Sequence, residues 1–188
     1  LALTEQAKKL GATTAFSAKQ AAEGMGFLGQ AGFNATEIQA AMGSVLNLAA
    51  AGALELADAA DITASVLRGF GMNATEATKV TDVLAKAAAS SNTSVQEMGE
   101  GFKFVGPVAS AMGLSIEETA AALSVLSDAG LKGSLAGTGL RQALVKMGPD
   151  IIRSGGLLPA LKKLDSEGVR AVTAAMDSLG ARAGTAAI

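Results

Sequence analysis

The sequence contains no cysteine, no histidine, no tryptophan and no tyrosine among its 188 residues. The absence of cysteine excludes disulfide bonds, thiolate nucleophiles and cysteine-type zinc sites. The absence of histidine removes the side chain that serves most often as a general base and as a metal ligand. Carboxylates, lysines and hydroxyl groups are the catalytic groups that remain, so the composition argues against an enzyme.

Charged residues are few and balanced. The chain carries 15 Lys and Arg against 17 Asp and Glu, and charged residues make up 17% of the sequence. A nucleic-acid-binding surface requires a basic patch, whereas the clusters of positive charge are limited to Lys8–Lys9 and Lys162–Lys163. The aromatic residues on which bases stack are limited to 6 Phe. We therefore expect no sequence-specific binding to nucleic acids.

A hydrophobic run long enough to span a membrane is missing. The longest uncharged stretch, 38–54, falls short of the required length of about 20 residues and contains Gly43 and Gly52. Hydrophobic residues nevertheless make up 49% of the chain. That content suits a folded protein with a sizeable core rather than a disordered tail.

Five helix starts are marked by capping boxes. In each box a Ser or Asn side chain accepts a backbone N–H of the first helical turn, and a Gln or Glu three residues later reaches back to the N–H of the capping residue. The boxes begin at Ser17, Asn34, Asn73, Ser94 and Ser115. Because each box opens a stretch with apolar residues at helical spacing, the pattern predicts five helices.

Two further helices are predicted without a box, over 54–70 and 134–147, because apolar residues recur there every three or four positions. No segment shows the sustained alternation of apolar and polar residues that is typical of strands. The predicted fold class is therefore all-α, built of stacked helical hairpins.

Glycine and proline indicate where helices end. Pro107 interrupts the fourth boxed helix, so we expect a kink or an early end near Gly106. The segment 148–156 breaks the apolar pattern and indicates a boundary, beyond which a short helix over 159–164 and a longer one over 166–179 are predicted. The glycines expected to stop helices stand before a box or after an apolar run: Gly32, Gly71, Gly113, Gly130 and Gly180.

The sequence repeats internally. A motif of Gly, a large apolar residue, Asn or Ser, and Glu three residues later recurs about every 40 residues, the length of one helical hairpin. A longer repeat aligns 17–29 with 94–106. This alignment predicts two related units of about 80 residues with four helices each, over about 17–93 and 94–148.

The domain organisation follows from the repeat and the boundary. We expect a helical-repeat core over 1–148 and a C-terminal helical extension over 149–188. Since the sequence starts at Leu1 rather than at a methionine, we also expect it to be a fragment of a larger chain.

Three pairs of carboxylates are the candidates for acid–base catalysis. A catalytic pair requires burial that separates the two pKa values. Two of the carboxylates, Glu97 and Glu118, are already explained as parts of capping boxes. A solvated or capping role is therefore favoured, and no catalytic residue is predicted. The pairs are Asp58 with Asp61, Glu97 with Glu100, and Glu117 with Glu118.

A glycine-rich segment and three asparagines are the other candidate sites. The glycine-rich segment 133–139 looks like a phosphate loop at first glance, but it lacks the Gly-Lys-Ser/Thr ending and no strand precedes it. A helix start with close packing fits it better. Glycosylation tripeptides begin at Asn34, Asn73 and Asn92, of which the first two are predicted caps. No cofactor-binding or metal-binding residue is predicted.

Several segments resemble bacteriophage tail tape measure proteins, and the resemblance extends over most of the chain. Its most specific part is the string Ser-Ser-Asn-Thr-Ser-Val at 90–95. The chain therefore resembles the conserved core of that family. Further similar strings lie within 48–71, 83–95, 109–120, 129–141 and 179–184.

The resemblance implies a structural role, because a tape measure protein runs inside the growing tail tube and its length sets the length of the tail. The implied partners are the tail tube, tail-tip or baseplate proteins and tail assembly chaperones. Self-association is left open, and membrane contact is expected only during infection. The implied locations are the virion tail and, during assembly, the host cytoplasm. The family carries no catalytic residues into this core, so no enzyme is expected.

A length argument refines the expected role. A single helix of 188 residues would span roughly 280 Å, whereas capped helices of about 15 residues make rods of roughly 22 Å. Our hypothesis is a compact docking or assembly domain, with the ruler supplied elsewhere in the parent protein. Two alternatives stay open. One is a generic helical-repeat scaffold that binds a partner helix in a groove, and the other is a membrane-active module, suggested by the mean hydropathy of +0.37.

Overall fold

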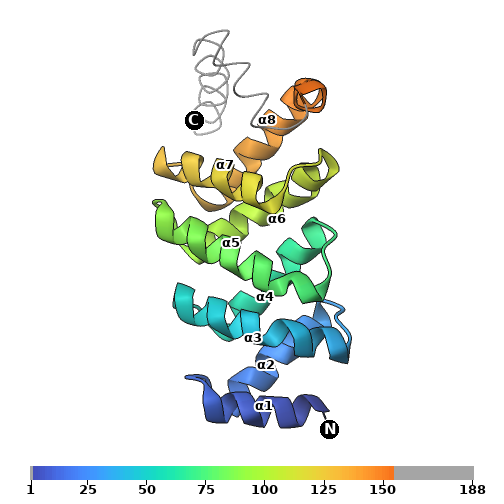
Figure 1. Cartoon of the computed structure of the whole chain (residues 1–188). Helices are drawn as coiled ribbons and strands as arrows, with labels where there is room; N and C mark the ends of the chain where they lie inside the picture. The colour runs from blue at the N-terminus through green and yellow to red at the C-terminus, as the bar shows by residue number, and fades with distance from the viewer. Residues whose placement is uncertain (1, 155–188) are drawn as a thin grey trace, which may run out of the picture.

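The computed structural model describes residues 2–154, which form α-helices, one short 3₁₀ helix and connecting turns, with no strand in that range (Figure 1). The all-α prediction is confirmed. The elements are α1 (Ala2–Thr13), α2 (Ala18–Gln30), α3 (Ala35–Gly52), α4 (Leu56–Gly69), the 3₁₀ helix η1 (Ala74–Glu76), α5 (Ala77–Ser90), α6 (Val95–Ala111), α7 (Ile116–Asp128) and α8 (Gly133–Ser154).

The helices stack in two layers. Helices α2, α4, α6 and α8 pack successively against one another and form what we call the even layer. Helices α3, α5 and α7 do the same and form the odd layer, while α1 packs chiefly on α2. Figure 1 shows the stack rising from α1 and the N-terminus at the bottom to α8 at the top. One hydrophobic core therefore continues from hairpin to hairpin, as in helical-repeat proteins.

Four of the five predicted capping boxes carry both hydrogen bonds, whereas the box at Asn73 carries only the bond from its backbone N–H, because the Asn73 side chain makes no capping hydrogen bond. At Asn34, for example, the side-chain Oδ1 accepts the N–H of Glu37 at 3.0 Å, and the Glu37 carboxylate accepts the N–H of Asn34 at 2.7 Å. At Asn73 the N–H donates to the Glu76 carboxylate at 2.9 Å, and the first turn is the 3₁₀ helix η1. Local side-chain chemistry thus fixes where five of the helical segments begin.

Several helices end at the glycines that were predicted to stop them, and these glycines have a left-handed backbone. Gly32, Gly71, Gly113 and Gly130 all have positive φ, whereas Gly180 lies outside the described residues. A positive φ was not predicted at Ala53, which has φ of 50° and ends α3. There the next N–H, that of the following leucine, donates to a carbonyl of the last turn at 2.9 Å, which satisfies an acceptor that the helix end leaves unpaired.

Two prolines that were expected to interrupt helices lie inside them. Helix α6 does not end near Gly106 but continues through Pro107 to Ala111. A proline removes one hydrogen bond and needs room for its ring, and the ring of Pro107 faces Gly69 at the end of α4, where an added Cβ would make ordinary van der Waals contact with it at 3.7 Å. Similarly, α8 runs through Pro149 to Ser154, so the helix break predicted after position 148 is wrong.

The remaining helix predictions differ from the structure mainly at the ends. Helix α4 spans Leu56–Gly69 against the predicted 54–70, and α1 was not predicted at all. The helices predicted over 159–164 and 166–179 lie outside the described residues. The division into units over 17–93 and 94–148, with an extension over 149–188, stays a prediction.

Glycines set the distance between helices of the even layer. A Cβ built on Gly99 of α6 would lie 2.7 Å from Cγ1 of Ile62 in α4. A Cβ built on Gly137 of α8 would lie 2.9 Å from the Cα of Gly101 in α6. Real side chains do not approach so closely, so α6 and α8 meet backbone to backbone, and the Ile62 side chain packs directly on the backbone of α6, as small residues at an interface permit.

Within residues 2–154, no single helix combines the length and the apolar composition needed to cross a membrane. Helices α3 and α4 meet both criteria only when counted together, and they are bent by 118° at the break between them.

Candidate functional site

Three of the candidate carboxylates meet between α4 and α6. Asp58, Asp61 and Glu100 line a cavity of about 50 Å³ together with Ile62, Gln96 and Lys103. The Lys103 ammonium donates to the Asp61 carboxylate at 2.5 Å, and 56% of the Asp61 side chain is exposed. The cavity is thus small, and its wall includes a solvent-exposed ion pair between two stacked helices. Its geometry suits helix–helix pairing rather than catalysis by two buried carboxyl groups.

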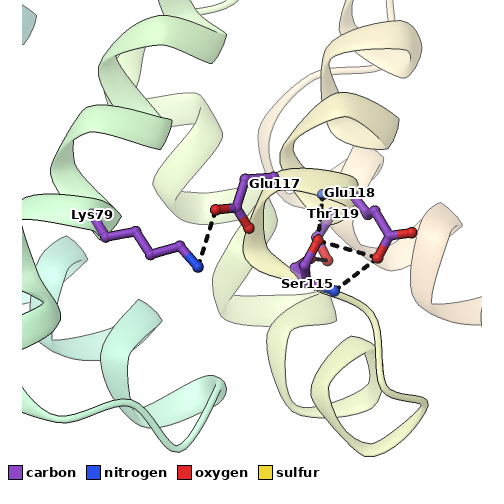
Figure 2. Close-up of polar contacts among 5 residues, drawn as sticks. All are labelled: Lys79, Ser115, Glu117, Glu118 and Thr119. Carbon is purple, nitrogen blue, oxygen red and sulfur yellow. Dashed lines mark hydrogen bonds and ion pairs between the residues drawn. The ribbon is translucent and has the colours of Figure 1, made fainter.

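A larger cleft of about 500 Å³ lies between α5 and α7, where Thr78, Lys79, Asp82, Val83, Lys86 and Glu117 line it. Figure 2 shows the Lys79 side chain reaching from α5 toward Glu117 at the start of α7, at 3.0 Å. Both side chains are 51% exposed, and such a pair contributes at most about 1 kcal/mol. The pair therefore links α5 to α7 but adds little to the stability of the odd layer.

The neighbouring carboxylates Glu117 and Glu118 serve different partners. Burial would raise the pKa of Glu117, but its own backbone N–H and the Lys79 ammonium outweigh burial, so the pKa lies below its usual value. Glu118 completes the capping box, since it accepts the N–H of Ser115 at 2.9 Å (Figure 2). The two carboxylates thus do not act as a pair.

Two residues of the string 90–95 take part in a polar junction between hairpins. We define the polar junction as Asn92, Ser94, Glu97, Asp128 and Lys132. The Asn92 N–H donates to the Asp128 carboxylate at 2.7 Å, and the Lys132 ammonium donates to Asn92 Oδ1 at 3.0 Å. The turn between α5 and α6 is thereby tied to the turn between α7 and α8. The polar junction therefore links successive hairpins where their chain reversals lie side by side.

Glu97 is the carboxylate of the polar junction with the most hydrogen bonds. It accepts the Ser94 N–H at 2.9 Å and the Thr93 hydroxyl at 3.2 Å. The Ser94 N–H lowers the pKa of Glu97 most, burial opposes it, and the Thr93 hydroxyl and the positive charge of Lys132 lower it further. The charged form of Glu97 is therefore favoured in the folded protein.

We expect Glu97→Gln to lower the free energy of unfolding at neutral pH. We also expect the free energy of unfolding of this variant to fall less than that of the parent protein when the pH is lowered. Because the folded pKa of Glu97 lies below its ordinary value of 4.5, its contribution is complete at neutral pH and is lost as the pH falls through the folded value. The contribution is a few tenths to about 1 kcal/mol, because part of the side chain is exposed. Urea unfolding between about pH 6 and pH 3 measures it.

Glu55→Gln is the matched control for Glu97→Gln, because Glu55 occupies the N-cap position of α4 and makes no capping hydrogen bond with its side chain. Since no capping hydrogen bond is lost, its unfolding free energy at neutral pH should lie closer to that of the parent protein than that of Glu97→Gln does. If both variants follow the parent protein equally, the explanation given for Glu97 is wrong.

The other candidate segments have structural positions. Gly133 opens α8 with φ of 54°, and Gly137 packs against the backbone of α6, so the helix start with close packing predicted for 133–139 is confirmed. Of the tripeptide asparagines, two are N-caps and Asn92 belongs to the polar junction. Among residues 2–154 there is no cluster of three His, Cys, Asp or Glu placed to hold a metal ion.

Sequence reasoning missed the apolar surface. Phe27 and Phe104 each stand ten residues after the serine of a capping box and are 41% and 45% exposed. Their equivalence is the only sequence signal that could have found them. The other large apolar side chains that are exposed in the described range all lie on the last two helices: Val125, Leu135 and Val145.

Comparison with known proteins gives a family match over nearly the whole chain and relatives over about three quarters of it. A family profile described as phage-related minor tail protein matches residues 4–187. The tape measure protein of Pneumococcus phage Dp-1 is 52% identical over 142 residues, which cover 76% of this chain and 12% of that protein. The probable tape measure protein of Escherichia phage P2 is 34% identical over 146 residues, which cover 78% of this chain and 18% of that protein. No solved structure matches significantly.

Proposed function

This chain belongs to the phage-related minor tail protein family, and on that premise we propose that it is a structural and assembly module of a tail tape measure protein. The tape measure names of both relatives support this role. The chain spans less than a fifth of the length of either relative. The role proposed here is therefore that of one folded region within a longer protein.

The observation that carries the proposal is that the chain folds back on itself. Its described helices have 12 to 22 residues, so each is a rod of roughly 18 to 33 Å. The helices stack side by side in two layers rather than end to end (Figure 1). A stacked module offers surfaces for contact and adds little length, so we assign it docking during assembly and assign length measurement to other parts of the parent protein.

The proposed partners follow from this role. We expect the module to contact tail tube, tail-tip or baseplate proteins and the tail assembly chaperones, first in the host cytoplasm and then in the finished tail. Its carboxylates serve capping boxes and ion pairs between helices. That use supports a non-enzymatic module.

In-frame deletion of these 188 residues from the parent gene should abolish tail assembly rather than shorten tails. A region that measured length as one extended helix would shorten tails by roughly 280 Å when deleted. Electron microscopy of infected-cell lysates gives the number and the length of the tails. Normal numbers of tails, shortened in proportion to the residues removed, would exclude the docking role.

Gly137→Leu in the same gene tests whether tail assembly depends on the fold of the module rather than on its length, because the substitution leaves the number of residues unchanged. We expect few or no tails, since the leucine cannot fit between α8 and α6. Gly43→Ala is the control, because Gly43 lies in α3 with no described atom within 4 Å of an added Cβ, and its tails should be normal in number and length. Normal tails from both variants would show that the folded module is dispensable.

A further inference from the structure

One seven-residue motif occurs twice in the even layer. Residues 23–29 of α2 and 100–106 of α6 both read Glu-Gly, two variable residues, Phe, an apolar residue and Gly. The two copies hold the same place in their helices, because Glu23 and Glu100 are each the sixth residue of the helix. In a stack of repeats, equivalent positions lie on the same side of the molecule. The two copies therefore face the same way.

Packing explains only part of the motif. A Cβ built on Gly24 would lie 2.9 Å from a side chain of α4, and one built on Gly101 would lie 3.1 Å from a side chain of α7. The apolar residue before the last glycine is buried in both copies. Packing does not explain the phenylalanines, since Phe27 is 41% and Phe104 is 45% exposed. A role outside the core is left for them.

Each exposed phenylalanine has a carboxylate one turn before it. Residues four positions apart lie on the same face of a helix, so Glu23 lies beside Phe27 and Glu100 lies beside Phe104. The Glu23 side chain is 55% exposed, and its contact with Lys19 at 3.8 Å joins two exposed groups, so it contributes little. A partner cation can replace such a contact at small cost.

The helix between the two copies adds a third carboxylate. Asp61 is the sixth residue of α4, and its side chain is 56% exposed and paired with Lys103 of α6. Asp61 and Glu100 line the same small cavity, so the carboxylates of α4 and α6 are neighbours. We call the three carboxylates and the two phenylalanines the acidic–aromatic face: Glu23, Phe27, Asp61, Glu100 and Phe104.

We propose that the acidic–aromatic face binds a basic amphipathic helix of another protein, which lies across α2, α4 and α6 along the direction of the stack. The inference rests on the proposed docking role, since it names the kind of partner that one surface of the module takes. Charge complementarity identifies this partner. Three carboxylates attract Lys and Arg, and an exposed ring next to a carboxylate suits an arginine, which stacks on the ring while it pairs with the carboxylate.

The spacing of the stacked helices favours a helical partner. Packed helices lie about 8–10 Å apart, so α2 and α6, with α4 between them, lie roughly 16–20 Å apart. A helix rises about 1.5 Å per residue, so two of its residues about 11 positions apart are separated by three turns and roughly 17 Å. These two residues point to the same side. One side of a partner helix therefore reaches both phenylalanines of the acidic–aromatic face.

Photo-cross-linking in the full parent protein, made in infected cells, tests the proposal. Phe27→p-benzoylphenylalanine and Phe104→p-benzoylphenylalanine should both cross-link to one positively charged segment of one other protein, at residues about 11 positions apart. The same photoreactive residue in place of Asn47, which is exposed on α3 in the odd layer, should not cross-link to that segment. Mass spectrometry of the cross-linked peptides identifies the residues.

Charge reversal tests the complementarity. Glu23→Lys should lower the yield of the cross-link from position 27 at least about fivefold, because it sets a positive charge against a basic partner. Asp82→Lys is the matched control, since it makes the same change of charge at an exposed position of α5 in the odd layer, and it should leave the yield unchanged. Thermal unfolding verifies that both variants remain folded.

Several outcomes would overturn the proposal. Absence of protein cross-links from both phenylalanine positions would show an unoccupied face. Cross-links to an acidic segment or to two different proteins would assign the face to another kind of partner, and cross-links to a second copy of this chain would make it a self-association surface. Equal losses from Glu23→Lys and Asp82→Lys would exclude local charge complementarity.

Tail number keeps this inference separate from the proposed function. If Gly137→Leu abolishes tails while the cross-links fail, the docking role stands and the assignment of this face is wrong. If Gly137→Leu leaves tails normal, the docking role itself is wrong, whatever the cross-links show.

Discussion

Replacing Gly137 with alanine is expected to lower the free energy of unfolding by about 3 kcal/mol, near the upper end of what overpacking usually costs. The added Cβ would lie 2.9 Å from both the Cα and the carbonyl carbon of Gly101. Because the atoms it meets are backbone, no side-chain rotation relieves the clash. Helices α6 and α8 must separate along their shared interface, so the loss is larger than for a clash with a flexible side chain. Urea or thermal unfolding measures it.

Gly43→Ala is the matched control for Gly137→Ala. Both glycines lie inside helices, and alanine favours a helix over glycine by up to about 1 kcal/mol. At Gly43 no described atom lies within 4 Å of the added Cβ, so the variant should be slightly more stable than the parent protein. If Gly137→Ala were also stabilising, the close approach of α6 and α8 would be wrong.

Phe102→Ala is expected to destabilise the protein by about 4 kcal/mol, the usual loss for a buried phenylalanine. Phe102 is 2% exposed, and its ring meets that of Phe70 edge to face with centroids 5.8 Å apart. The substitution removes this aromatic pair and leaves a cavity between α4 and α6, which the glycine-mediated approach of these helices prevents from closing. The midpoint and slope of urea unfolding give the loss.

Phe104→Ala provides the comparison, because it changes the same residue type on the same helix two positions later. Phe104 is 45% exposed, so its removal should change the unfolding free energy by less than about 1 kcal/mol. Equal losses in the two variants would contradict the packing of α6 described here. A difference of several kcal/mol confirms which face of α6 lies in the core.

The sequence predicts helix starts well where the signal is local. In each capping box the two hydrogen-bonding partners lie within three residues of each other, so the sequence alone identifies both of them. The boxes begin at Ser17, Asn34, Asn73, Ser94 and Ser115. Helix α1 begins without a box, and nothing in its composition marked its start. The prediction failed there for lack of a local signal rather than through a competing one.

Tertiary packing explains the failure at Pro107. A proline breaks a helix in isolation, but α6 continues through Pro107 because the face that carries Phe102, Val105 and Ala109 is buried in the core. The residue of α4 that Pro107 faces, Gly69, is 38 residues away in the sequence, so this packing becomes visible only when the layers are known.

In the candidate sites too, contacts between neighbouring residues were predicted and contacts between distant segments were not. The capping roles of Glu97 and Glu118 were predicted and are confirmed. The bond from Asn92 to Asp128 was not predicted, because it joins residues 36 positions apart in two different turns. The resemblance to tape measure proteins, which rested partly on the string containing Asn92, is confirmed by the family match and by both relatives.

The regular spacing of the even-layer helices bears on how this region varies in length. Gaining or losing about 39 residues, one whole hairpin, leaves every glycine opposite a suitable neighbour. Gaining or losing half that number would exchange the layers and place large side chains against backbone. Among related phages, insertions and deletions inside this stack should therefore come in whole hairpins, whereas those in its turns should be free to take any size.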